Sequence, residues 1–276
     1  MRITAVVPLL FSLIAFILSL LCVFAGSKRG YLENGDLLTL NTSMLGRLTL
    51  NTSSSHSSLL NSIESSIKGD INGLVADVAK KLNIHDFYSA HILDYCEGFY
   101  TPSAVANLTA HPSKNVTKCS NQTATFHFDP AKAIQDELKP GINLTDLKWP
   151  SKVQDGLTAV KLASNVMFVL YCIGIAAIGV ALIGALIGVF AAGRFAAMIN
   201  TMLSFLAFFA LMLASAISTG VIVKVTDVVN KHGNDIGLAA YQGKTFLGMT
   251  WAATILALLT SFVWFAEIII GRRRQA

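Results

Sequence analysis

Residues 162–223 form an apolar stretch that contains a single charged residue, Arg194. On either side of Arg194 the apolar run is roughly 30 residues long, and about 20 residues are enough to cross a bilayer as a helix. A helix on the surface of a soluble protein keeps one polar face, and neither run has one. Because backbone polar groups in lipid must pair within their own segment, the two runs are predicted to be membrane helices that fold back on each other near Arg194.

The composition agrees with a membrane protein and argues against a nucleic-acid partner. Hydrophobic residues make up 53% of the chain and charged residues only 13%, whereas typical soluble domains carry about 25% charged residues. The net charge of +5 arises mainly outside residues 27–161, where 13 basic residues balance 13 acidic ones. No basic patch with interleaved aromatic residues is present, so the sequence predicts no binding to nucleic acid.

Two further apolar segments complete a plan of four membrane helices. The first follows Arg2 and has about 20 apolar residues, which is longer than the roughly 7–15 of a signal-peptide core. An uncleaved helix is therefore favoured over a cleaved signal peptide, for which residues 23–25 would be an acceptable site. The predicted order is a membrane helix at 1–26, an ectodomain at 27–162, a membrane helix at 163–193, a cytosolic turn at 194–195, a membrane helix at 196–223, a second extracellular loop at 224–245, a membrane helix at 246–270 and a cytosolic tail at 271–276.

Two independent signals predict which side of the membrane each loop faces. Six Asn-x-Ser/Thr sequons lie within residues 27–162 and none lies elsewhere. Because glycan transfer is lumenal, this segment is predicted to be extracellular. Arginines at the other ends of the helices then lie inside, as the positive-inside rule requires, which predicts a multi-pass plasma-membrane protein with both termini in the cytosol. The sequon asparagines are Asn41, Asn51, Asn107, Asn115, Asn121 and Asn143, and the arginines are Arg2, Arg194, Arg272, Arg273 and Arg274.

The ectodomain is predicted to be mainly helical and irregular. Between residues 60 and 82 apolar residues recur at three- and four-residue steps, which is typical of one face of an amphipathic helix. Trp149 and Pro150 fit the start of another helix. The apolar stripe of that helix runs directly into the membrane segment, so the helix at 163–193 is expected to project well above the bilayer. The predicted fold class is an all-α membrane protein, a bundle of four transmembrane helices. The apolar positions of the stripe are Leu60, Ile63, Ile67, Ile71, Leu74, Val75, Val78 and Leu82.

Gly184 and Gly188 form a small-x-x-x-small pair in the second membrane helix. Small residues allow the backbones of two helices to approach closely, which matters in lipid because no hydrophobic force drives helices together there. We favour packing inside the same bundle over a dimer interface. A dimer interface at this pair would instead allow lateral association with another copy of the chain or with another membrane protein.

Four cysteines divide between two environments. Cys96 and Cys119 lie in the ectodomain, where an oxidising compartment favours a disulfide. That bridge closes a loop of about two dozen residues and is worth roughly 3 kcal/mol in chain entropy. Cys22 and Cys172 lie in predicted membrane helices and are interpreted as small apolar packing residues.

No metal, cofactor or catalytic site is predicted. The histidines near the two ectodomain cysteines do not have the spacing of a compact zinc ligand set, so they are expected to lie on the surface. No nucleophile elbow, P-loop, zinc-protease helix or dinucleotide fingerprint is present, so the sequence predicts neither an enzyme nor a small-molecule substrate. Apart from Glu267 near the last arginines, the apolar helices carry no acid or histidine pair of the kind that marks ion pathways. The histidines considered are His85, His91, His111 and His127.

Two stretches of the chain resemble a known family. The first begins at residues 85–88, passes through the Tyr-Cys-x-Gly core at residues 95–98, and continues with Cys119 and residues 126–130. The second leads into the last helix. Together with the topology, these stretches make the chain similar to the fungal Sur/PalI family of claudin-like four-span plasma-membrane proteins. The residues of the second stretch are Gly237, Ala240, Gly243, Phe246 and Trp251.

The resemblance implies a structural protein of eisosome-type cortical membrane domains, which supports membrane compartments and cell-wall organisation. Its partners would be membrane lipids, other membrane proteins and the cell wall. The tryptophan-bearing signature of animal claudins is absent, so tight-junction function is not implied. The tail of six residues is much shorter than that of family members that act in ambient-pH signalling. A membrane sensor or signalling accessory for ambient pH or wall stress is therefore the alternative, and a calcium-influx regulator is less favoured.

Overall fold

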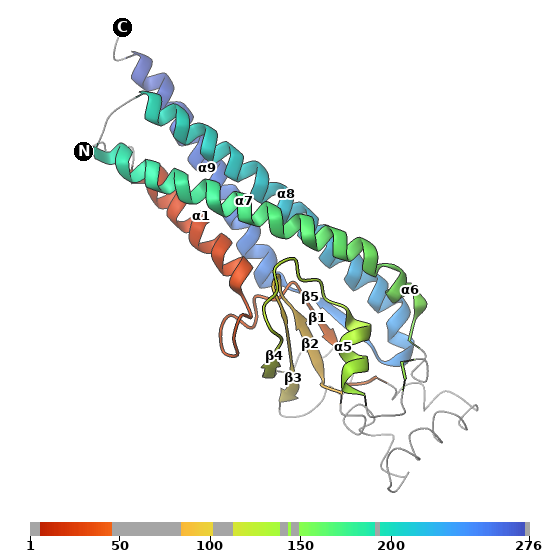
Figure 1. Cartoon of the computed structure of the whole chain (residues 1–276). Helices are drawn as coiled ribbons and strands as arrows, with labels where there is room; N and C mark the ends of the chain where they lie inside the picture. Colours follow the sequence, from red (N-terminus) through yellow and green to blue (C-terminus); the bar gives the residue numbers. More distant parts are fainter. Residues whose placement is uncertain are drawn as a thin grey trace, which may run out of the picture.

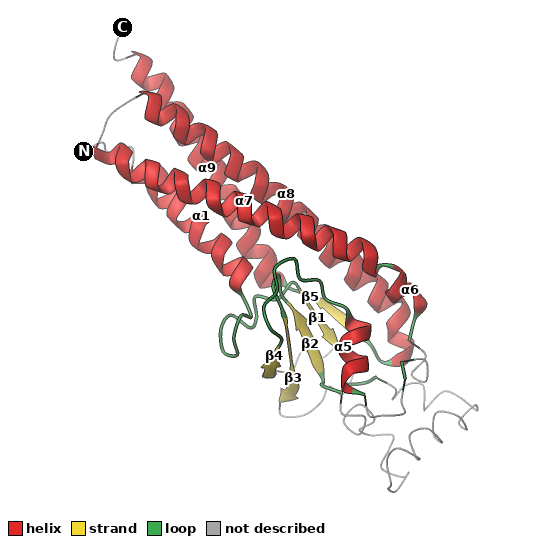
Figure 2. Ribbon diagram, in the orientation of Figure 1, coloured by secondary structure: helices red, strands yellow, loops and turns green. Residues whose placement is uncertain are grey.

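The computed structural model describes residues 6–45, 84–101, 113–138, 143–144, 149–190 and 194–273. The predicted amphipathic helix at residues 60–82 lies outside the described residues. Four long helices form an elongated bundle, and a small sheet lies at one end of it (Figures 1 and 2). Both termini lie at the opposite end, together with the end of α7 and the start of α8.

Each of the four long helices contains a segment that is long and apolar enough to cross a membrane. This confirms the predicted number of membrane helices. The 34 residues of α7 extend over about 50 Å, whereas the hydrocarbon core of a bilayer is about 30 Å thick. Helix α7 therefore projects beyond the membrane, as its apolar stripe indicates. The helices are α1 (Val6–Phe24), α7 (Leu157–Phe190), α8 (Arg194–Gly233) and α9 (Lys244–Arg273).

The ectodomain contains a five-stranded antiparallel sheet, so the prediction of an all-α fold with a mainly helical and irregular ectodomain was wrong in this part. The strand order is β4-β3-β2-β1-β5. Strands β1 and β2 have four residues each and are buried at every position. The Leu-Thr-Leu-Asn of β1 alternates apolar and polar residues and was a signal that the prediction missed, whereas the Phe-Tyr-Ser-Ala of β2 does not alternate. The strands are β1 (Leu38–Asn41), β2 (Phe87–Ala90), β3 (Tyr95–Thr101), β4 (Ser113–Cys119) and β5 (Ala239–Gln242).

The last strand, β5, comes from the segment that was predicted to be a polar loop at 224–245. Helix α8 continues to Gly233, a 3-10 turn covers Asn234–Ile236, and β5 then pairs with β1. Gly237 makes the turn into the strand with a φ of +84°, and a Cβ atom there would lie 1.9 Å from the carbonyl oxygen of Met44. Only glycine suits this position. The interpretation as a loop was wrong because the partner of β5 lies some 200 residues earlier in the chain.

Two short helices connect the sheet to the bundle. Helix α5 (Pro130–Glu137) begins at Asp129, whose carboxylate accepts a hydrogen bond from the Lys132 amide, and proline occupies its first turn. Helix α6 (Ser151–Asp155) follows Trp149 and Pro150, as predicted, and leads directly into α7.

The sheet and the helices share a continuous apolar core. In one cluster Leu40 and Tyr88 of the sheet pack with Val229 of α8. In another, Leu37 and Ile92 pack with residues of all four long helices. The ectodomain is therefore packed onto the bundle and is not joined to it by a linker. Many large apolar side chains on the outer faces of the helices are exposed, as expected of surfaces that face lipid.

Gly184 and Gly188 face other helices of the same bundle. A Cβ atom at Gly184 would lie 2.2 Å from the side-chain oxygen of Asn200 on α8. A Cβ atom at Gly188 would lie 3.2 Å from the ring of Trp264 on α9. The pair thus permits close packing within one chain, which is the alternative that the sequence favoured.

Candidate functional site

The predicted disulfide is present. Cys96 on β3 and Cys119 at the end of β4 are direct partners across the two strands, with their Cα atoms 4.0 Å apart. The bridge lies beside a small apolar cluster that includes Phe87, Tyr100 and Val116. It therefore fixes the edge strand β4 to the centre of the sheet, over a separation of 23 residues.

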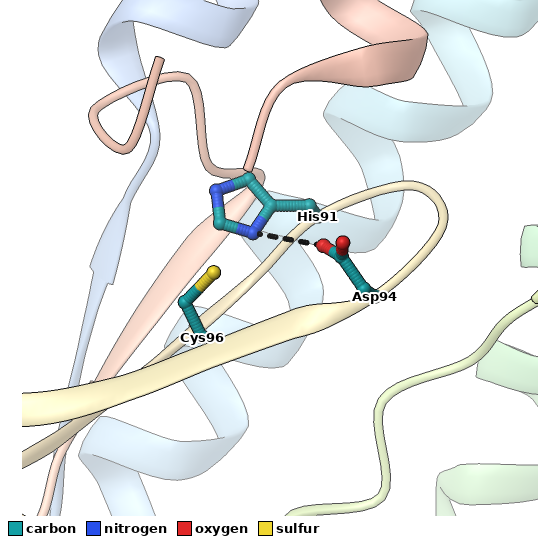
Figure 3. Close-up of side chains that lie close together, drawn as sticks. All are labelled: His91, Asp94 and Cys96. Carbon is teal, nitrogen blue, oxygen red and sulfur yellow. Dashed lines mark ion pairs between the residues drawn. The ribbon is translucent and has the colours of Figure 1, made fainter. Parts of the chain in front are cut away.

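A buried acid–base pair lies in the turn between β2 and β3, next to the disulfide (Figure 3). His91 Nδ1 and Asp94 Oδ1 are 3.5 Å apart, and both side chains are fully buried. Burial lowers the pKa of His91 and raises the pKa of Asp94 to about 7. Both shifts favour the uncharged forms, because the low dielectric around the pair penalises charge.

The same cluster holds the loop that follows α1. Gly26 has a φ of +75°, and a Cβ atom on it would lie 2.4 Å from the His91 ring. The carbonyl oxygen of Gly26 lies 3.3 Å from Cys96 Sγ. A side chain at this glycine would displace either the imidazole or the loop. The cluster of His91, Asp94 and Cys96 therefore couples the first membrane helix to the sheet.

His91, Asp94 and Cys96 place their ligand atoms within 4.8 Å of one another. A sulfur atom binds a metal as a thiolate, and Cys96 is engaged in the disulfide. The oxidised cluster therefore offers an ion only two ordinary ligands. Its chemistry is that of a buried acid–base pair.

A second acid–base cluster joins α5 to the sheet. Glu137, the last residue of α5, has its Oε1 atom 2.8 Å from Nδ1 of His85, and the Tyr88 hydroxyl donates a hydrogen bond to Oε2 of Glu137. Glu97 of β3 lies beside them, and its other neighbour is Lys118, at 3.6 Å. His85, Glu97 and Glu137 also bring their ligand atoms within 4.8 Å of one another.

The pKa values in this second cluster move in different directions. Burial, reinforced by the nearby charge of Glu137, raises the pKa of Glu97 to about 7. Burial by itself would lower the pKa of His85, but its hydrogen bond with Glu137 outweighs that effect and raises it. Burial would likewise raise the pKa of Glu137, but hydrogen bonds with His85 and Tyr88 lower it. The cluster is best described as an ionised His85–Glu137 pair beside a carboxyl group that titrates near neutrality.

A third polar group lies where β4 approaches the first strand. The ammonium group of Lys114 lies 3.3 Å from Asp36, 2.5 Å from the hydroxyl of Thr39 and 3.1 Å from that of Ser89. Its Nζ atom also lies 5.7 Å from the centre of the Phe87 ring. Lys114 thus gives the charge of Asp36 a partner and connects the edge strand to β1 and β2.

Among the described residues, the buried polar side chains between the helices are uncharged, and most of them are hydroxyls. The hydroxyl of Tyr171 on α7 is 2.5 Å from that of Thr250 on α9. Ser215 on α8 lies 2.6 Å from Thr250 and 3.0 Å from Thr254. These hydrogen bonds connect three membrane helices at one level, and none of them needs a charged group.

Four of the six predicted glycosylation sites lie in the described part of the chain. Asn115, Asn121 and Asn143 are exposed. Asn41 is fully buried in β1, and its amide donates a hydrogen bond to the hydroxyl of Tyr241. Its burial makes Asn41 the least accessible of these four as an acceptor, and glycosylation of each of them stays a prediction. Asn51 and Asn107 lie outside the described residues.

The predicted topology residues that the structure describes belong to the end of the bundle away from the sheet. Arg194 is the first residue of α8, and Arg272 and Arg273 are the last two of α9. Arg2 and Arg274 lie outside the described residues. The positions of Arg194, Arg272 and Arg273 agree with one common side for the α7–α8 junction and the end of α9. Which side of the membrane that is stays a prediction.

The sequence did not predict the buried acids and bases of the ectodomain. His85 and His91 were expected on the surface, whereas His91 is buried and His85 is half-buried. The available signal was local: residues 87–101 are rich in aromatic side chains, which favour strands. Strand pairing there brings Glu97 opposite Tyr88, which places a carboxyl group among buried rings.

Comparison with known proteins gives one match. A family model described as the SUR7/PalI family matches residues 4–263. No curated protein and no solved structure matches the chain. The family model covers nearly all of the chain, including α1, α7, α8, most of α9, the disulfide-bearing sheet and both acid–base clusters. The protein is therefore a multi-pass membrane protein that belongs to the SUR7/PalI family.

Proposed function

We propose that this protein is a structural organiser of plasma-membrane domains of the eisosome type, and that it supports membrane compartments and cell-wall organisation. The observation that carries the proposal is the pairing of β5 with β1. One strand from the loop between α8 and α9 completes a sheet whose other four strands precede α7. The ectodomain is thereby fixed to three of the four helices, as a scaffold needs and a freely tethered binding module does not.

The orientation follows from the sequence signals. The ectodomain faces the cell wall, and both termini are cytosolic. Exposed acceptors at Asn115, Asn121 and Asn143 carry glycans on that side. The exposed apolar faces of the helices contact lipid and neighbouring membrane proteins. The family membership supports this arrangement, and no catalytic step is assigned to the chain.

The test is localisation of the full-length protein in living cells beside a marker of eisosomes. We expect immobile cortical patches that coincide with the marker. Gly243→Ala should disperse them, since a Cβ atom there would lie 1.6 Å from the carbonyl oxygen of Asp36 and would force β5 out of place. Gly248→Ala is the matched control, because a Cβ atom at Gly248 has no neighbour within 4 Å. An even distribution of the wild-type protein would contradict the proposal.

A second function, sensing of ambient pH, is favoured by one specific observation. Asp94 and Glu97 have pKa values raised to about 7, chiefly by burial. Both groups therefore change charge within the physiological range. Glu97→Gln should abolish a pH-dependent cellular response while the protein still reaches the membrane. Asp136→Asn, which alters an exposed acid of α5, should leave the response intact, and an unchanged response in Glu97→Gln would reject the sensor.

A calcium-influx regulator has less support. The buried polar groups described between the helices are uncharged: hydroxyls such as those of Ser215 and Thr250, and the amide of Asn200. Unchanged calcium uptake after deletion of the protein would argue further against this role.

A further inference from the structure

A cavity of about 500 Å³ lies where the sheet faces the ends of α7 and α8. Its floor includes Leu40 of β1 and Phe128, and its walls are formed by the two helices. Almost all of the lining is apolar. The volume falls within the range of about 300–1,000 Å³ that is typical of small-molecule sites, and an apolar cavity of this kind favours an apolar occupant over water.

The cavity begins inside the membrane-spanning part of the bundle. Met167 on α7 and Ile217 on α8 line its inner end, and both belong to the long apolar stretch. On α8 the lining continues to Val229, which is about 18 Å farther along the helix. One leaflet of a bilayer is about 15 Å thick. The cavity therefore begins in the apolar part of the bundle and extends beyond it toward the sheet.

Small residues leave the cavity accessible from outside. Gly156, Ala159 and Gly220 line it and are exposed. A Cβ atom at Gly220 would meet no other atom within 4 Å. An occupant therefore has an entrance between α7 and α8 that no large side chain closes.

The charged side chains that line the cavity are cationic. Among the described residues that form it, the ionisable groups are lysines and histidines, and none is acidic. Lys224 is exposed and is the first charged residue of α8 beyond the apolar stretch, at the level where lipid headgroups lie. Lys152 lies farther out, on α6. An ammonium group in this position pairs well with a phosphate.

We propose that this cavity binds a phospholipid from the leaflet on the side of the sheet, with its phosphate beside Lys224 and one acyl chain turned away from the membrane into the space between α7, α8 and the sheet. Apolar lining, an inner end in the apolar part of the bundle and a cationic rim all match such an amphiphile. The bound lipid would fill the space between the projecting helices and the ectodomain. The site would exist whether or not the chain organises cortical domains.

The experiment uses the full-length protein in phosphatidylcholine vesicles that contain a small fraction of phosphatidylcholine with a diazirine at the end of one acyl chain. After irradiation, labelled peptides are identified by mass spectrometry. We expect labels at residues 153–160 and 225–229, which lie beyond the membrane-embedded part of α7 and α8. Labels confined to membrane-embedded residues would overturn the proposal, and so would labelling of 153–160 and 225–229 by a diazirine sterol in place of the phospholipid.

Two variants sharpen the result. Gly220→Leu should lower labelling of these peptides roughly tenfold, about 1.4 kcal/mol, which equals the displacement of about two methylene groups. Gly248→Leu is its control, since Gly248 has equally open space but does not line the cavity. Lys224→Gln should also weaken labelling, whereas Lys231→Gln, an exposed lysine of α8 outside the cavity, should not. Equal labelling of wild type and Gly220→Leu, with both folded by circular dichroism, would show that the cavity is not the site.

Discussion

In the ectodomain the buried polar side chains include paired acids and bases, whereas those described between the membrane helices are all uncharged. His91 lies beside Asp94 and His85 beside Glu137. At the level of Thr250 only hydroxyl groups meet. A charge in lipid is costly wherever it cannot reach water, so helices that pack in a bilayer rely on close contact and neutral hydrogen bonds. The sheet lies beyond the apolar segments of the helices, so the cost of burying charge in lipid does not apply to it.

The ectodomain and the helical bundle should therefore respond to different treatments. The ectodomain has a disulfide and groups that titrate near neutrality, so reductant and pH should act on it. The bundle has neither among its described interhelical contacts, so it should respond mainly to changes in packing. The shared apolar core means that a disturbance of the sheet can reach the upper ends of α7 and α8, but not their far ends.

Removal of the disulfide has the largest expected effect. Cys96→Ser should destabilise the sheet by about 3 kcal/mol through loop entropy, while the four helices remain formed. Limited proteolysis of the protein in nanodiscs, followed by mass spectrometry, should show cleavage in the sheet and protection in the helices. Cys172→Ser, which alters an exposed free cysteine, is the control. Equal loss of protection in both regions would break the distinction.

The stability of the ectodomain should fall as pH rises from about 5 to about 8. Asp94 and Glu97 keep their protons in the fold up to a pKa of about 7, whereas the unfolded chain releases them near pH 4. The folded state therefore binds more protons, and rising pH destabilises it. The raised pKa of His85 acts in the same direction, because its stabilisation is lost as pH rises through the folded value. The lowered pKa values of Glu137 and His91 act in the opposite direction, because the unfolded chain binds their protons more readily than the fold does. The two raised carboxyl groups and His85 are expected to outweigh them.

Hydrogen exchange of the sheet amides at several pH values measures this effect. Glu97→Gln should flatten the profile, since an amide cannot titrate, and Asp136→Asn should not. Exchange in the membrane helices should keep the same profile in both variants. A sheet whose protection increases from pH 5 to pH 8 would show that the buried carboxyl groups are ionised in the fold.

In the bundle, Thr250→Val should cost about 0.6–2 kcal/mol, the range for interhelical hydrogen bonds in membranes. The substitution leaves the hydroxyls of Tyr171 and Ser215 without their common partner. Thr260→Val is the matched control, because the hydroxyl of Thr260 bonds only within its own helix, to the carbonyl oxygen of Leu256. Thermal unfolding in detergent should separate the two variants. Identical melting temperatures would show that the hydroxyl cluster contributes nothing beyond packing.

The smallest effect on stability is expected from the exposed sequons. Asn115→Gln and Asn121→Gln should each remove one glycan without altering the fold, which an endoglycosidase mobility shift would report. Asn41→Gln should leave the glycan pattern unchanged but disturb the contact with Tyr241. A glycan recovered on Asn41 would contradict its burial. A complete lack of glycans would place the sheet on the cytosolic side.

The four membrane helices were predictable because length and apolar composition are enough to define them. The Cys96–Cys119 bridge was predictable because only two cysteines lie in the ectodomain. The strands were harder to predict, because β1 and β2 have only four residues each and are buried at every position, and only β1 alternates apolar and polar residues. Strand β5 is four residues long and is defined only by its pairing with β1. The acid–base clusters depend on those pairings, so they could not be assembled from the sequence.

The amino-acid sequence by itself determined that this chain crosses a membrane four times, since the cost of exposing unpaired backbone to lipid leaves only helices for such apolar runs. It also determined which two cysteines meet in the ectodomain. Only the tertiary structure decided that the two loops share one sheet, that His91 and Glu97 are buried, and that a cavity lies between that sheet and α7 and α8. These features arise from contacts between residues far apart in the chain, which no local pattern records.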